Sequence, residues 1–150
     1  MRKAIFGLAL LTGLASCSTD VLDERSYSVS HLDHQLNGDY VISLEGDDDF
    51  YGRFLYNWID STTNTSFNLF QSSVSNTPKA YRFFKVNDLG EVTYEVRMST
   101  FNVDPYGNLT IDSEYEVFEV LDFVINEDNV VESMNVVTPS GTASSLQIIE

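Results

Sequence analysis

Short segments in which apolar and polar residues alternate follow one another from residue 38 almost to the end of the chain. The clearest covers residues 91–98, where the apolar residues take every second position. Successive side chains of a β-strand point to opposite faces, so a two-residue period predicts strands. Turn-forming sequences separate the segments, among them residues 87–90 and 104–108. The sequence therefore predicts an all-β domain of antiparallel hairpins.

About eight such strands are expected between residues 38 and 150, with short connections. A row of strands leaves two exposed edges unless the sheet closes, and an eight-stranded up-and-down barrel removes both. We therefore expect an antiparallel up-and-down barrel over residues 31–150. A β-sandwich is the alternative, although it would require longer crossover connections. Residues 30–38 combine a capping serine, two leucines four residues apart and a final glycine, which predicts a short helix before the barrel.

The N-terminal segment has the order of a signal peptide. Arg2 and Lys3 precede an uncharged, mostly apolar run at residues 4–14, which is too short to span a bilayer about 30 Å thick. Cys17, the only cysteine of the chain, follows closely. Residues 14–17 (Leu-Ala-Ser-Cys) resemble the lipobox of bacterial lipoproteins. This resemblance implies that residues 1–16 are cleaved and that Cys17 carries acyl chains such as palmitate.

The same resemblance implies a place for the protein. It would be anchored by lipid in the bacterial cell envelope, with the outer membrane expected because Ser18 fits the sorting default of Gram-negative lipoproteins. The periplasmic face and the cell surface both remain open. Residues 17–30 are polar and charged, and we expect them to form a flexible tether with a reach of roughly 20 Å.

The charge of the chain restricts its partners. It has 23 acidic and 8 basic residues, and its formal net charge is −15 at pH 7. Such a surface repels phosphate backbones, so we expect no nucleic-acid partner. It also repels anionic membrane surfaces, so acyl chains would have to supply the membrane attachment. A single cysteine cannot form an intramolecular disulfide, which leaves packing and hydrogen bonds to hold the fold.

Aromatic residues gather in three consecutive predicted strands. Aromatic side chains on a concave barrel face are suited to a small apolar ligand, and the alternative is that they fill a solid core. We expect Trp58 to be buried and to face the interior, because its strand is apolar on both faces. The candidate ligand-binding residues are Tyr51, Phe54, Tyr56, Trp58, Phe67, Phe70, Tyr81 and Phe83.

The order of the predicted elements suggests a family likeness. A short helix, a first strand that opens with Gly38-Asp39-Tyr40 and a series of hairpins resemble the lipocalin-like barrels of small bacterial lipoproteins. The resemblance implies non-covalent binding of a small apolar or amphiphilic ligand. The alternative is a structural or interaction lipoprotein with a filled core that contacts another envelope protein.

The sequence has little that predicts catalysis or metal binding. Both histidines lie in residues 30–38, away from any nucleophile pattern, so we expect no enzyme activity and no cofactor. Four carboxylates in one turn are candidate calcium ligands. The alternative is that they only form the turn, and we expect no metal. These calcium candidates are Glu45, Asp47, Asp48 and Asp49.

Ser61 is a candidate modification site. Asp60-Ser61-Thr62 resembles the O-glycosylation acceptor of Bacteroidota proteins, which would make Ser61 the glycosylated residue. The same three residues are also ordinary turn-forming residues.

The lipid anchor can be tested directly. Replacement of Cys17 by serine should leave the precursor unlipidated and abolish retention in the membrane, because no other residue could accept the acyl chains. Membrane fractionation of cells that express each form measures the effect. A Cys17→Ser protein that still sediments with the membranes would contradict the lipobox interpretation.

Overall fold

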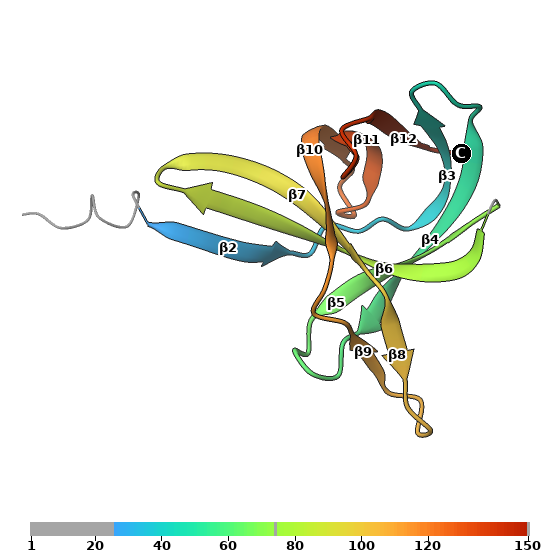
Figure 1. Ribbon diagram of the computed structural model, residues 1–150, viewed down its shortest axis with the longest axis vertical. Helices are drawn as coiled ribbons and strands as arrows, with labels where there is room; N and C mark the ends of the chain where they lie inside the picture. The colour runs from blue at the N-terminus through green and yellow to red at the C-terminus, as the bar shows by residue number, and fades with distance from the viewer. Residues whose placement is uncertain (1–25, 74, 150) are drawn as a thin grey trace, which may run out of the picture. The chain divides into compact units, whose positions relative to one another are not determined.

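The computed structural model describes residues 26–73 and 75–149, and that part of the chain is all-β (Figure 1). Its strands are β2 (Tyr27–Leu32), β3 (Gly38–Leu44), β4 (Phe50–Ile59), β5 (Ser66–Ser72), β6 (Ser75–Asp88), β7 (Glu91–Ser99), β8 (Phe101–Val103), β9 (Leu109–Ile111), β10 (Glu116–Ile125), β11 (Val131–Val137) and β12 (Ala143–Ile148). Over these residues, no helix has the length and hydrophobicity that crossing a bilayer would require. The predicted all-β class is confirmed.

Eight of the described strands form a closed antiparallel barrel. The strand order is β6-β5-β4-β3-β12-β11-β10-β7, and pairing of β6 with β7 joins the two ends of the row. The barrel prediction is therefore confirmed, and the sandwich alternative is not the observed fold. β2 adds a further strand beside β6, and β8 with β9 forms a separate two-stranded sheet. Closure leaves no free edge between the eight barrel strands.

Contacts divide the chain into two compact units, one of which includes residues 31–85 and 94–149. The described part of the other includes residues 26–30 and 86–93. In this smaller unit Leu89 and Gly90 have φ angles of 53° and 92°, as a two-residue hairpin turn requires. The backbone N–H of Leu89 donates to the carbonyl of Ser26 at 3.3 Å. The predicted turn at residues 87–90 is confirmed, and β2 begins inside the segment that was expected to be a tether.

Residues 30–38 are not helical, so that prediction is wrong. β2 runs to Leu32, β3 begins at Gly38, and the segment between them bonds to distant parts of the chain. The N–H of Gln35 donates to the carbonyl of Asn129 at 2.9 Å, and the N–H of Val131 donates to the carbonyl of Gln35 at 2.7 Å. These partners satisfy the backbone groups that a helix would have paired locally.

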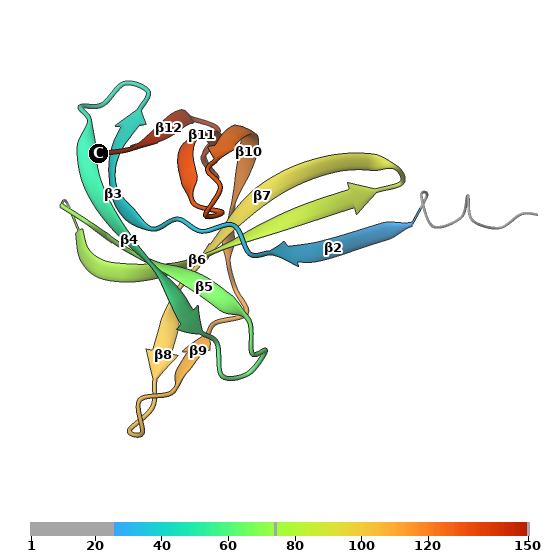
Figure 2. The same ribbon diagram turned by 180° about the vertical axis from the view of Figure 1, so that it is seen from behind.

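Figure 2 shows the chain between β2 and β3, and the hydrogen bonds of residues 33–37 place this segment across one end of the barrel, which we call the closed end. Leu36 is fully buried, and its N–H donates to Oδ1 of Asn68 on β5 at 2.9 Å. Its neighbour Gln35 bonds to residues 129 and 131 at the start of β11. β5 and β11 lie on opposite sides of the ring of strands. A segment that bonds to both must cross the barrel.

Tyr40 forms a further hydrogen bond at the closed end. Its hydroxyl donates to the carbonyl of Val131 at 2.5 Å, which joins β3 to β11. Burial raises the pKa of the Tyr40 hydroxyl to about 12, so the group stays protonated and can donate at any physiological pH.

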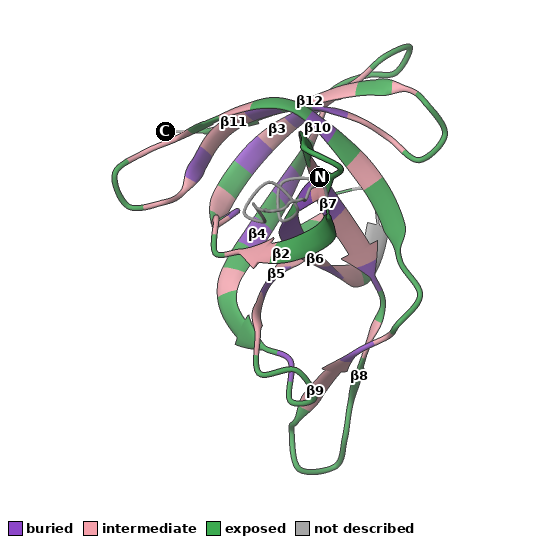
Figure 3. Ribbon diagram, turned by 90° about the vertical axis from the view of Figure 1, so that its left-hand side faces the viewer, coloured by how far each residue is buried: buried purple, intermediate pink, exposed green. Residues whose placement is uncertain are grey.

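Buried residues alternate with exposed ones along the barrel strands (Figure 3). The interior cluster includes buried side chains from β3, β4, β6, β7, β10, β11 and β12. A second cluster joins Phe67 of β5, Ala80 of β6 and Ile111 of β9. β5 therefore buries Phe67 in one cluster, while its Phe70 packs against the other.

Trp58 does not face the interior, so its predicted burial is wrong. Its side chain is 39% exposed. Leu55 pairs with Leu69, but Trp58 pairs with Phe67, so β4 has one residue more than β5 between these pairs. Asn57 has a φ of 82° at this bulge. The extra residue places Trp58 on the face of Phe67 instead of the face that carries Phe54 and Phe70.

The Tyr40 hydrogen bond leads to a stability prediction. Tyr40→Phe keeps the ring but removes the donor to the Val131 carbonyl, and it should lower the free energy of unfolding by about 1–2 kcal/mol. Urea denaturation measures the change. Tyr106→Phe is the matched control, because the Tyr106 side chain is 90% exposed and should tolerate the change. Equal stabilities of the two variants would contradict the structural role of Tyr40.

Candidate ligand-binding site

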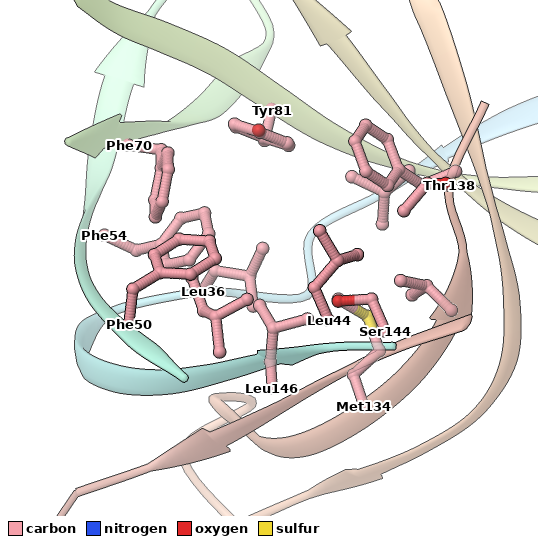
Figure 4. Close-up of a pocket in the computed structure, with 14 residues that line it drawn as sticks. Leu36, Leu44, Phe50, Phe54, Phe70, Tyr81, Met134, Thr138, Ser144 and Leu146 are labelled. Carbon is pink, nitrogen blue, oxygen red and sulfur yellow. The ribbon is translucent and has the colours of Figure 1, made fainter. Parts of the chain in front are cut away.

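The barrel of the larger unit contains an apolar cavity of about 200 Å³ (Figure 4). An engineered cavity of about 150 Å³ in another protein holds benzene, so this volume is sufficient for a small ligand. The residues that line it are Leu36, Ile42, Leu44, Phe50, Phe54, Phe70, Tyr81, Val96, Phe118, Met134, Val136, Thr138, Ser144 and Leu146.

Three aromatic rings form one wall of the cavity. The Phe54 and Phe70 ring centroids are 4.5 Å apart, and Tyr81 lies 5.5 Å from Phe54 and 5.6 Å from Phe70. Tyr81 meets the other two rings edge to face, an arrangement that aromatic pairs favour. In Figure 4 these rings lie across the cavity from aliphatic side chains, including Leu44 and Leu146.

Gly52 leaves the space that the Phe70 ring occupies in this wall. A Cβ atom on Gly52 would lie 2.2 Å from Cε1 of Phe70 and 3.0 Å from Cδ1 of Ile42. Any other residue would force the Phe70 ring to move, since contacts this short are not tolerated in packed interiors. Glycine on β4 therefore lets the ring lie close over the strand.

The part of Tyr81 that is available to a ligand in the cavity is its ring, because its hydroxyl is already hydrogen-bonded. The hydroxyl donates to Sδ of Met98 at 2.9 Å. Burial, followed by the nearby negative charge of Glu116, raises the pKa of Tyr81 well above its usual range. The group is therefore neutral and already has a hydrogen-bond partner, and the surface that it offers a ligand is mainly apolar.

The cavity is polar only toward the end of the barrel opposite residues 33–37, which we call the open end. Ser144 pairs with Leu44 and with Val136, which places it near the last residues of β3 and β11. The Ser144 hydroxyl donates to the carbonyl of Ser43 at 3.0 Å, and the Thr138 hydroxyl accepts from the N–H of Thr142 at 3.0 Å. The lining residues include no charged side chain. The arrangement can hold an apolar group, with weak hydrogen-bonding capacity at the open end.

The structure brings together only some of the predicted ligand-binding residues. Phe54, Phe70 and Tyr81 line the cavity. Phe83 is buried in the interior cluster without lining it, and Phe67 belongs to the second cluster. The other three lie elsewhere: Tyr51 is 60% exposed, Trp58 is on the far side of the bulge, and Tyr56 is half-buried outside the lining.

Sequence reasoning missed the aliphatic wall. Ile42 belongs to β3, whereas Leu146, Met134 and Val136 belong to β12 and β11, and β3 is far from β12 along the chain but adjacent to it in the sheet. Their positions share the two-residue period of inward-facing residues, and that period is the signal by which they could have been found.

The other candidate site residues are not part of the cavity lining. Among the described residues, no three histidine or carboxylate side chains are close enough to hold a metal ion, and this includes the calcium candidates in the turn at residues 45–49. Asp60 is buried and accepts from the N–H of Thr62 at 3.1 Å and from the Thr63 hydroxyl at 2.9 Å. Ser61 is exposed, with its Oγ 3.2 Å from Oγ1 of Thr110. Asp60 thus supports the turn, and glycosylation of Ser61 stays a prediction.

Cys17 lies outside the described residues, so lipidation also stays a prediction. Comparison of the chain with family models, with curated proteins and with solved structures gives no match.

Proposed function

We propose that this protein binds a small apolar or amphiphilic molecule without chemical change, inside a barrel that acyl chains on Cys17 anchor in the bacterial envelope. The cavity of about 200 Å³ carries the proposal, because a barrel with only a structural role has no need of an unfilled interior. Its apolar lining and the engaged hydroxyls of Thr138 and Ser144 support binding more than catalysis.

The volume suggests the size of the ligand. A cavity slightly larger than the one that holds benzene suits a single ring or a chain of about seven carbons. Burial of seven methylene groups at about 0.8 kcal/mol each contributes about 5–6 kcal/mol, which corresponds to a Kd near 0.1 mM. This is an upper limit to the affinity, because the loss of freedom on binding opposes it.

A second candidate function is contact with another envelope protein. Tyr51, Leu55 and Trp58 expose apolar side chains on the outer face of β4, and each is at least 39% exposed. Aromatic and aliphatic residues of this kind are common in the centres of protein interfaces. This function would use the outside of the barrel and does not require the cavity.

Leu44 offers a direct test of ligand binding. Leu44→Trp places a larger side chain at the open end, so the affinity for 1-heptanol should fall at least about tenfold because the cavity is filled. Isothermal titration calorimetry of the purified protein measures the affinity. Leu121→Trp is the matched control, since Leu121 is exposed on β10 and the variant should bind like the wild type.

Two outcomes would contradict the proposal. One is failure of the wild type to bind 1-heptanol, and the other is equal affinity of the two tryptophan variants. A thermal melt of each variant establishes whether it is folded. If Leu44→Trp proves unfolded, Ser144→Phe fills the same end from β12 and takes its place in the comparison.

A further inference from the structure

The turn that joins β3 to β4 carries four carboxylates next to the cavity. Residues 45–49 are Glu-Gly-Asp-Asp-Asp, and all of them are exposed. The residues on each side, Leu44 and Phe50, both line the cavity. Since successive Cα atoms are about 3.8 Å apart, the Cα of each acidic residue lies within about 12 Å of a lining residue. The four charges are therefore close to the open end.

The other groups near the open end do not balance this charge. The turn at residues 138–142, between β11 and β12, has no ionisable side chain. On the side of β6 and β10, Lys79 lines a surface pocket together with Glu114 and Glu116. These three side chains have a net negative charge. The effect of Glu116 reaches the cavity lining, because its charge helps to raise the pKa of Tyr81.

This distribution favours one kind of ligand head group. A carboxylate at the open end would lie near several negative charges, and the cavity lining has no positive side chain to pair with it. An ammonium group would be attracted instead. A unit charge about 10 Å away changes an affinity about twofold in water at low salt, and several such charges act together.

We propose that the ligand of this cavity is a cationic amphiphile: its apolar chain of about seven carbons lies against Phe54, Phe70 and Leu146, and its protonated amine lies at the open end near residues 45–49. This inference rests on the proposed function and adds the charge of the ligand to it. A fatty-acid anion would find no positive side chain in the lining with which to form a charge-assisted hydrogen bond.

Three ligands of equal chain length test the inference. Heptylammonium, 1-heptanol and heptanoate each have seven carbons and carry a positive, a neutral and a negative head group, and calorimetry of the purified protein at about 10 mM salt, where screening is weak, measures each affinity. We expect heptylammonium to bind most tightly and heptanoate most weakly, with the difference reduced when salt is added.

Two double variants test whether the carboxylates at residues 45–49 are the ones that attract the ammonium group. Asp47→Asn/Asp48→Asn removes two charges from the open end and should weaken heptylammonium binding about fourfold at low salt, with no change for 1-heptanol. Glu127→Gln/Asp128→Asn removes two charges from the turn between β10 and β11, whose Asn129 bonds to the segment of the closed end. This control should leave both affinities unchanged.

The outcomes separate the two proposals. If none of the three ligands binds, both the apolar site and the inference fail. If 1-heptanol binds but heptylammonium binds no more tightly than heptanoate, the apolar site stands and the cationic ligand is overturned. Equal losses in the two double variants would also overturn it, because the attraction would then come from the net charge of the whole protein.

Discussion

Pairing of β6 with β7 is the constraint on which the rest of the structure depends. It joins the two ends of a row of eight strands, so that their inward faces enclose a single interior. An open sheet with the same sequence would leave two rows of unpaired backbone groups and would expose one apolar face. Closure also determines which side chains contact one another in the interior, because the register of each hairpin decides which alternate residues face inward. The cavity is a consequence of this geometry.

The two ends of the barrel differ for identifiable reasons. At the closed end, Leu36 is buried, and Asn68 together with the start of β11 satisfies the backbone of residues 33–37. At the open end, the lining stops at Thr138 and Ser144, and no comparable segment is bonded across the strands within residues 26–73 and 75–149. An amphiphilic ligand fits this asymmetry, since its apolar part can be buried while its polar part stays near water.

The sequence predicts the architecture well because its signals are local. Alternation along residues 91–98 and the turn at residues 87–90 depend only on neighbouring residues, and both were correctly interpreted. The helix expected at residues 30–38 failed because its competitors, Asn68 and residues 129–131, are far along the chain. Local capping signals contain no information about such partners.

Prediction of the site was less complete, for a related reason. One extra residue in β4 reverses the face of Trp58. Asn57, which has a positive φ at the bulge, is only a weak signal for it, because asparagine is also common in turns. Phe54, Phe70 and Tyr81 were found because aromatic residues suggest ligand contact. Gly52 was missed because its role is to leave space for Phe70. Such a role is visible only when both strands are in place.

The central claim is that the barrel interior is an accessible apolar cavity. A crystal structure determined under xenon pressure tests it most directly, because xenon enters dry apolar cavities of this size without any need for a specific head group. The account predicts a xenon atom between the aromatic wall of Phe54 and Phe70 and the aliphatic side chain of Leu146, with the protein otherwise unchanged. Absence of xenon from the barrel, with these side chains closed into contact, would contradict the claim.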